Sequence, residues 1–466
     1  MTAYRDTAPA ISPVAQRLDL LPVTRTHRRV VVAVGLGLFF DMYEVFLAGT
    51  ISGALTKEFG LRGIGLSVLL SSAFLGMFLG AAVIGRITDR VGRRRMFLLS
   101  LAWYSVWSLL GAFAPSAGWL VACRFLAGIG VGAEYPVSDT YLSDVLPARF
   151  RGRLAAWAYT CSYFAVPALG FLSLALADRS PLQFAGWRWL LALGALGAVF
   201  VVFLRRSLPE SPRWLEATGR HREAQAELAA FEDAPPLRRQ PKIVISAART
   251  APGTPSTPVR STGPLTPKAL TRAPYRRRLG MLAVFHLLQT FGYYGFGTLA
   301  AIVLTARGYT VQHSLLYTAL AFLGYPLGSL LSIPLIARFE RKFLIVGSVL
   351  AMAALGLGFA GSVLPALIVA CGLAFTTVSN IFSNAYHIYQ AEIFPTELRA
   401  SATGWTYALS RMTTGLMPFL LLPLLEARGP GSVFLVVATA MLIVAADIAL
   451  LGPRTSARSL EEINPR

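Results

Sequence analysis

The sequence predicts an all-α integral membrane protein with twelve transmembrane helices in two pseudo-symmetric six-helix bundles. Three observations lead to this fold class: the apolar composition, the spacing of apolar runs and an internal repeat. Of 466 residues, 55% are hydrophobic and only 14% are charged, and the mean hydropathy is +0.57. A soluble protein carries about a quarter charged residues, so this composition indicates a polytopic membrane protein.

Twelve apolar runs are each long enough to cross a bilayer. The hydrocarbon core is about 30 Å thick, and a helix needs about 20 apolar residues to span it. The first six runs lie at 29–54, 65–88, 96–114, 118–142, 151–177 and 187–204. The other six lie at 278–304, 314–337, 343–362, 364–391, 398–424 and 431–452.

An internal repeat divides these runs into two sets of six. DVLPARFR at 144–151 matches EIFPTELR at 392–399, and DRVGRR at 89–94 matches ARFERK at 337–342. Both matches have the offset of 248 residues, which indicates two parallel halves. Such duplication is typical of transporters that rock one half against the other around a site at the membrane midplane.

The basic residues are concentrated on one side of the predicted membrane. The formal charge is +20, and about 35 of the 43 Lys and Arg residues fall on the side of the N-terminus. The positive-inside rule therefore predicts that both termini are cytoplasmic. We expect a multi-pass protein of the inner cell membrane. The loop at 205–278 holds 15 basic and 6 acidic residues, but no aromatic-basic platform accompanies them, so we expect no nucleic-acid partner.

The predicted organisation follows from these spans. It comprises a cytoplasmic tail at 1–28, a first bundle at 29–204, a cytoplasmic loop at 205–277, a second bundle at 278–452 and a cytoplasmic tail at 453–466. Within the loop, 212–232 has the pattern of a short amphipathic helix. Residues 234–274 are rich in Pro, Ser and Thr without periodicity, which predicts a disordered tether.

Several motifs resemble the major facilitator superfamily. GRITDRVGRRR at 85–95 is similar to the signature of its cytoplasmic loop 2-3, and RFLAGIGVGAEYP at 124–136 is similar to its fourth-helix motif. PESPRWL at 209–215, AEIFPTELR at 391–399 and PRTSARSLEEI at 453–463 resemble elements of its sugar porters. The resemblance implies the major facilitator fold and a secondary transporter that works by alternating access.

The seventh apolar run, at 278–304, indicates the branch within that superfamily. The sugar-porter signature QQxSGxNxxxYY is absent, and LLQTFGYYGFG stands at 287–297 instead. This stretch, with FFDMYE and EYP, resembles the metabolite:proton symporters, which include nicotinate and aromatic-acid transporters. The resemblance implies proton-coupled uptake of a small organic metabolite, such as an aromatic or carboxylic acid. A sugar:proton symporter remains an alternative, as does an efflux antiporter, although VPALGF at 166–171 keeps little of the antiporters' GPxxGG element.

Two carboxylates interrupt the first apolar run. Asp41 and Glu44 lie three residues apart in FFDMYEVFLAG, on one helix face, where a charge costs about 2.5–3.5 kcal/mol. Because two nearby carboxylates disfavour simultaneous ionisation, one of them should hold a proton near neutral pH. We expect Asp41, Glu44 and the intramembrane Arg124 to couple transport to protons, as the resembling sugar porters link a helix 1 acid and this arginine to coupling. The alternative is a static ion pair between helices 1 and 4.

The second half differs at the matching place, where Gly292 and Gly295 replace the two acids. Polar and aromatic side chains there can orient a planar or hydroxylated solute. The candidate substrate residues are Tyr43, Gln289, Tyr293, Tyr294, Asn380, Asn384, Tyr386 and His387. Hydrogen bonding between helices is the alternative role for each of them.

Opposite charges at helix ends predict a cytoplasmic gate. Asp89 stands near Arg90 and Arg93, Asp144 near Arg151, Glu210 near Arg213, and Glu392 near Arg399, and such pairs can latch the halves together. The candidate gate residues are Gly85, Asp89, Arg90, Gly92, Arg93, Asp144, Arg151, Glu210, Arg213, Arg338, Arg341, Glu392 and Arg399. The alternative is a topology signal alone. Gly128, Gly130 and Gly132 should permit close helix packing.

Other classes of protein find little support in the sequence. Cys123, Cys161 and Cys371 fall within apolar segments, which argues against a disulfide framework or a zinc site. No nucleophile–base or metal constellation is visible, so we expect no enzyme and no cofactor. A sensor would need a cytoplasmic output domain, and the loop at 205–277 is too short for one. A channel would not need two halves with a gate between them, which the repeat and the helix-end charges predict. The expected partners are the substrate, the proton and the lipid bilayer, and we expect a monomer.

Overall fold

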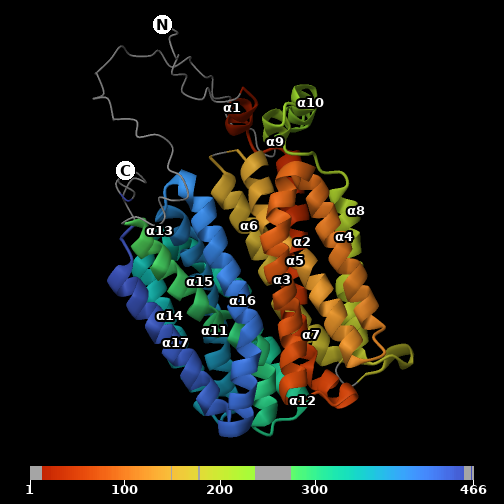
Figure 1. The fold of residues 1–466 in the computed structure, drawn as a ribbon, viewed down its shortest axis with the longest axis vertical. Helices are drawn as coiled ribbons and strands as arrows, with labels where there is room; N and C mark the ends of the chain where they lie inside the picture. Colours follow the sequence, from red (N-terminus) through yellow and green to blue (C-terminus); the bar gives the residue numbers. More distant parts are fainter. Residues whose placement is uncertain (1–12, 148, 177–178, 237–273, 456–462, 464–466) are drawn as a thin grey trace.

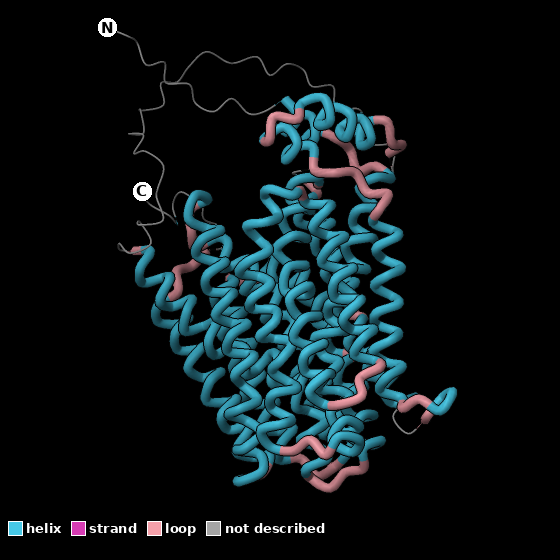
Figure 2. The backbone as a smooth tube through the Cα atoms, turned by 45° about the vertical axis from the view of Figure 1, so that its right-hand side comes forward, coloured by secondary structure: helices cyan, strands magenta, loops and turns pink. Residues whose placement is uncertain are grey.

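The computed structural model describes residues 13–147, 149–176, 179–236, 274–455 and 463, and these form long α-helices joined by short loops (Figures 1 and 2). Three short helices lie together at one end of the long bundle: α1 (Pro13–Leu20), α9 (Pro212–Ala217) and α10 (His221–Glu232). We call this end the loop side, and the other end the far side.

The long helices form two sets that match the two predicted halves. The N half contains α2 (Arg25–Phe59), α3 (Gly63–Val91), α4 (Arg93–Ala112), α5 (Ala117–Val145), α6 (Arg151–Tyr163), α7 (Ala165–Leu176) and α8 (Gly186–Arg205). The C half contains α11 (Tyr275–Ala306), α12 (Val311–Phe322), α13 (Gly324–Arg338), α14 (Arg341–Gly361), α15 (Pro365–Glu392), α16 (Thr396–Arg428) and α17 (Pro430–Leu451). The pairs α6–α7 and α12–α13 each make one crossing.

Eleven crossings in the described part of the chain are long and apolar enough to span a membrane. The twelfth long helix is α4, whose 20 residues pack beside α5 and α8. Its three initial arginines, its serines and its tryptophans lower its mean hydropathy. The all-helical, two-bundle fold class is therefore confirmed.

The loop side differs in detail from the sequence prediction. Two helices, α9 and α10, stand where we predicted one helix at 212–232, because Gly219 adopts φ of 79° and breaks the helix. The N-terminal tail contributes the helix α1, which we did not predict. Of the predicted tether at 234–274, residues 237–273 lie outside the described residues, as do 1–12 of the N-terminal tail and most of the C-terminal tail.

Helix α1 docks on α10 rather than extending freely. The Arg17 guanidinium donates to both carboxylate oxygens of Glu232, at 2.9 and 2.6 Å. Val14 and Leu18 are buried in one apolar cluster with Phe231. The tail and the two loop helices therefore form one packed cap on the N half.

Helices α3 and α5 approach each other at backbone distance. A Cβ atom on Gly128 would collide with the backbone of Ala73, and one on Gly132 with the backbone of Met77. The contact is reciprocal, since Gly76 and Gly80 of α3 meet the α5 backbone in the same way. Small residues at one-turn spacing permit such contact in lipid, where apolar burial alone does not drive helices together.

The halves meet on the far side and in the middle of the bundle. Gly49 of α2 packs against the backbone of Thr298 in α11. Gly170 of α7 contacts Ala319 of α12 in the same way. Closer to the loop side, the Thr160 and Ser329 hydroxyls lie 2.9 Å apart.

A cavity of about 840 Å³ lies between the halves on the far side, lined by the far-side ends of α2, α3, α7, α8, α11, α12 and α16. Its lining on α2 begins at Thr50. Along α2, the Gly49–Thr298 contact stands between this cavity and the carboxylates at 41 and 44.

The α3–α5 contact predicts a matched pair of outcomes. Gly128→Ala should destabilise the protein by about 1–3 kcal/mol, because the backbone of Ala73 cannot yield to the new methyl group. Gly118→Ala, in the first turn of the same helix, places its methyl group where no atom lies within 4 Å and should leave stability unchanged. Thermal unfolding of the purified protein in detergent measures both. Equal melting temperatures for the two variants would contradict the packing argument.

Candidate functional site

Glu44 forms a buried ion pair at the centre of the N half. Its Oε1 accepts hydrogen bonds from Arg124 of α5 and from the Ser108 hydroxyl of α4, the latter at 2.8 Å. Arg124 also donates to the Glu44 backbone oxygen at 3.0 Å. Both charged side chains are 1–3% exposed. The structure thus brings together the predicted pair and anchors α2 to α4 and α5.

Asp41 lies one turn away and is fully buried. Neither of its carboxylate oxygens has a hydrogen-bond partner within the described residues. The charges of Glu44, Glu134 and Arg205 in the N half, and of Arg411 in the C half, all act on it. Asp41 is therefore a buried carboxyl group that has no hydrogen-bond partner in the described structure and is influenced by the charges of two acids and two arginines.

A second buried ion pair was missed from the sequence. Arg205, the last residue of α8, donates to Glu134 of α5 at 2.5 Å and to the backbone oxygen of Ala33 at 3.1 Å. Its guanidinium lies 4.3 Å from the centre of the Phe97 ring. A Cβ atom on Gly37 would occupy the same space as this guanidinium. Glycine at 37 is thus required for Arg205 to reach between α2 and α5.

The polar residues of the C half join its own helices. The Gln289 amide donates to the Ser410 hydroxyl of α16 at 3.1 Å. Asn384 donates to Ser332 of α13 at 2.8 Å, and Asn380 donates to the backbone oxygen of Tyr325. These contacts correspond to the helix-to-helix role, and substrate contact by these residues stays a prediction.

The candidate aromatic residues fall in different places. Tyr43 is buried in the N half, where its hydroxyl donates to the backbone oxygen of Leu190 at 2.9 Å. Tyr293 and Tyr294 pack edge to face at 4.8 Å between ring centres. Tyr386 stacks on His387 at 4.2 Å. The C-half aromatics thus form two ring pairs, one on α11 and one on α15, and Tyr43 joins neither pair.

Tyr294 stands at the junction of the halves. Its ring packs edge to face against Phe74 of α3 at 5.7 Å and stacks near Phe46 of α2 at 6.5 Å. On its other side, the Arg411 guanidinium lies 5.1 Å from its ring centre. Arg411 lies within the apolar run predicted at 398–424, and we assigned it no role from the sequence.

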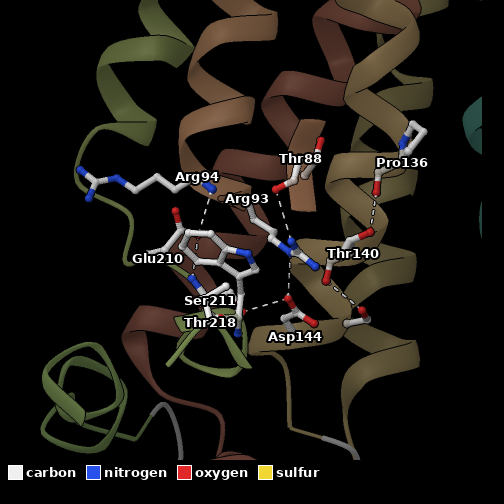
Figure 3. A network of polar contacts seen from close by, with 11 residues as sticks. Thr88, Arg93, Arg94, Pro136, Thr140, Asp144, Glu210, Ser211 and Thr218 are labelled. Carbon is white, nitrogen blue, oxygen red and sulfur yellow. Dashed lines mark hydrogen bonds and ion pairs between the residues drawn. The ribbon is translucent and has the colours of Figure 1, made fainter. Parts of the chain in front are cut away.

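The loop side of the N half carries a polar network (Figure 3). Arg93 points between Thr88 and Asp144, with 3.4 Å between its Nε and the Asp144 carboxylate. Ser211 donates to the same carboxylate at 2.9 Å, and the backbone N–H of Arg94 donates to Glu210 at 3.0 Å. The network ties the start of α4, the end of α5 and the start of α9 together.

Two predicted gate residues have a partner that the sequence did not suggest. Asp19 of α1 accepts from Arg151 at 3.1 Å and from Arg213 at 2.7 Å. The sequence placed these arginines beside Asp144 and Glu210, but the structure pairs both with the N-terminal tail. No sequence motif marks Asp19, because it lies in a polar tail outside the repeat.

In the C half, Arg341 pairs with Glu392 at 3.3 Å, and Arg338 is exposed. The side chains of Asp89, Arg90 and Arg399, and the surroundings of Gly85, lie outside what the structure describes. Every gate ion pair that the structure describes joins elements of one half. A latch between the halves stays a prediction.

Two six-helix bundles, one of them with buried ion pairs at its centre, define a secondary transporter of the major facilitator type. The chain belongs to the Sugar (and other) transporter family, whose model matches residues 42–466. This assignment makes the protein a multi-pass membrane transporter and not an enzyme.

Relatives of this chain include the putative metabolite transport protein YyaJ of Bacillus subtilis (strain 168), 30% identical over 96% of this chain and 97% of the relative. The niacin transporter NiaP of Acinetobacter baylyi is 30% identical over 96% of this chain and 98% of that protein. Among solved structures, a D-xylose–proton symporter superposes with a TM-score of 0.70 at 20% identity, covering 93% of this chain and 99% of the symporter. That likeness shows the fold.

The Glu134–Arg205 pair predicts strong coupling between two substitutions. Arg205→Met should cost about 3–5 kcal/mol, because it leaves Glu134 charged and buried without its cation. Adding Glu134→Gln removes that charge and should recover most of the loss. A double-mutant cycle on thermal stability in detergent measures the coupling, and additive losses would show that the pair does not stabilise the fold.

Proposed function

We propose that this protein is a proton-coupled symporter that imports a small organic metabolite across the inner cell membrane by alternating access. The observation that carries this proposal is Asp41, a fully buried carboxyl group without a hydrogen-bond partner in the described structure, one turn from the Glu44–Arg124 pair. The concentration of basic residues supports cytoplasmic termini, so the loop side would face the cytoplasm.

The two carboxylates have different surroundings and therefore different roles. Glu44 accepts hydrogen bonds from Arg124 and Ser108, which stabilise its ionised form. An ionised carboxylate without hydrogen bonds is costly in a dry interior, so Asp41 is better accommodated with a proton. Asp41 is then the group that carries the proton, and Glu44 holds Arg124 in place beside it.

The substrate we propose is an aromatic or carboxylic acid of the nicotinate type. The niacin transporter among the relatives supports this class, as do the two aromatic pairs of the C half, Tyr293 with Tyr294 and Tyr386 with His387. A sugar:proton symporter is the second candidate, favoured by the xylose symporter's fold. Uptake competition among nicotinate, benzoate, a dicarboxylate and hexoses separates the two.

The loop-side charges have a mechanical role in this proposal. The Arg93–Asp144 and Arg341–Glu392 pairs fix helix ends within each half, so that each half can move as a rigid body. When the halves close on the loop side, the same charged ends approach one another and can exchange partners.

Substitutions in α2 test the proton-coupling part. Asp41→Asn should abolish uphill uptake driven by an inward proton gradient, because the amide cannot release a proton. Exchange of labelled for unlabelled substrate should persist, because it needs no net proton movement. Glu44→Gln should also abolish uphill uptake while sparing exchange, since Arg124 then loses its counter-charge. Proteoliposomes with an imposed pH gradient measure both activities.

The matched control is Glu223→Gln, which removes an exposed carboxylate on α10 and should transport like the wild type. If Asp41→Asn and Glu44→Gln both still concentrate substrate, the two acids are structural. If the rate of wild-type uptake does not depend on the pH gradient, transport is not coupled to protons.

A further inference from the structure

Arg411 is a buried cation in the middle of the C half. It lies on α16, and its side chain is 4% exposed. Its guanidinium donates to the Tyr407 hydroxyl one turn away, and lies 4.8 Å from the Tyr407 ring centre and 5.1 Å from that of Tyr294. Two aromatic faces therefore hold the planar cation in a fixed orientation.

The charge of Arg411 reaches the polar groups of both halves. It acts on His286, Tyr386 and His387 within the C half, and on Asp41 of the N half. Tyr294, against which it packs, also touches Phe46 and Phe74 across the junction. Arg411 thus packs against the aromatic ring that meets the N half, and its charge influences the buried carboxyl group of that half.

Rocking of the halves changes this arrangement selectively. Glu44, Arg124, Glu134 and Arg205 all belong to helices of the N half, so a rigid-body movement keeps them beside Asp41. Arg411 belongs to the other half, so its distance to Asp41 changes when the halves move. Among the described residues whose charges act on Asp41, Arg411 is the one that belongs to the C half, so it lets the C half influence Asp41.

The surroundings of Arg411 fit one class of ligand. A guanidinium presents paired N–H donors that match a carboxylate bidentately, which an ammonium group cannot do. Tyr386 and His387 stack on each other at 4.2 Å near the loop-side end of α15, and aromatic faces of this kind suit a planar ring. A planar aromatic ring that carries one carboxylate meets both requirements.

We propose that Arg411 binds the carboxylate of an aromatic-acid substrate and that the bound anion favours protonation of Asp41. The second part rests on the proposed proton symport, whereas the first does not. The anion offsets the positive charge that acts on Asp41, so the acid and the proton bind more readily together than separately. The loaded carrier then gains no net charge, which suits movement through a low-dielectric site.

The experiment compares two probes that share a ring and differ in charge. Binding of nicotinate and nicotinamide is measured by calorimetry on purified full-length protein in detergent. Arg411→Gln should weaken nicotinate binding by at least about tenfold and change nicotinamide binding little, since only the acid pairs with the cation. Arg411→Lys keeps the positive charge but lacks the paired N–H donors of the guanidinium. Its nicotinate affinity should fall between those of the wild type and Arg411→Gln.

Controls separate this role from a structural one. Arg428→Gln removes an exposed arginine from the last turn of the same helix and should bind both probes like the wild type. Retained nicotinamide binding by Arg411→Gln shows that the variant is folded. If Arg411→Gln binds neither probe, Arg411→Lys provides the test. The ratio of its nicotinate affinity to its nicotinamide affinity must be smaller than the wild-type ratio and larger than one.

The outcomes distinguish this proposal from the proposed function. Equal nicotinate affinity in the wild type and Arg411→Gln overturns the assignment of Arg411. The assignment of Arg411 is also overturned if the wild type binds no aromatic acid but takes up a neutral compound with protons. That result would still support proton symport. Nicotinate binding that depends on Arg411, with uptake indifferent to pH, supports the carboxylate site and overturns the coupling to Asp41.

Discussion

The cost of placing charge in a membrane is the constraint on which this structure depends. Two buried ion pairs meet that constraint in the N half: Glu44 with Arg124 joins α2 to α5, and Glu134 with Arg205 joins α5 to α8. Breaking either pair leaves a buried charge uncompensated, which costs several kcal/mol. The pairs therefore hold the helices around Asp41 in one arrangement, supported by the backbone contact of α3 with α5.

The junction of the halves is built from different chemistry. Gly49 against Thr298, Gly170 against Ala319, and the ring contacts of Phe46 with Tyr294 and Tyr325 are apolar or depend on small residues. The hydrogen bonds of Thr160 with Ser329 and of Ser67 with the Pro418 backbone add uncharged polar contacts. In the described parts of the chain, no ion pair crosses this junction. Apolar surfaces can separate and meet again without leaving an unpaired charge in the membrane. Strong ionic contacts within halves and weak contacts between them suit a carrier that moves by rigid-body rocking.

The sequence predicted the features that follow from local pattern. Hydropathy located the twelve long helices, the repeat located the halves, and intramembrane charge singled out Glu44 and Arg124. The Glu134–Arg205 pair escaped because Arg205 ends an apolar run, where a basic residue is normally a topology signal. Asp19 escaped because its partners are set by the docking of α1, and long-range docking leaves no periodic trace in sequence. Gly219 was visible, but its effect on the loop helix depends on its positive φ.

The two halves also divide the chemistry of the central site. Where the N half has Asp41 and Glu44, the C half has Gly292 and Gly295, and a Cβ atom on Gly292 would lie 2.6 Å from the Met441 sulfur. Glycine there lets methionines pack tightly, so that face of α11 is sealed and holds no charge. The cation of the C half lies instead on α16, facing aromatic rings. A carboxyl group fixed in one half and a cation fixed in the other interact most strongly in a single relative position of the halves. Any ligand that neutralises the cation weakens that preference, and so makes the position of the halves depend on what is bound.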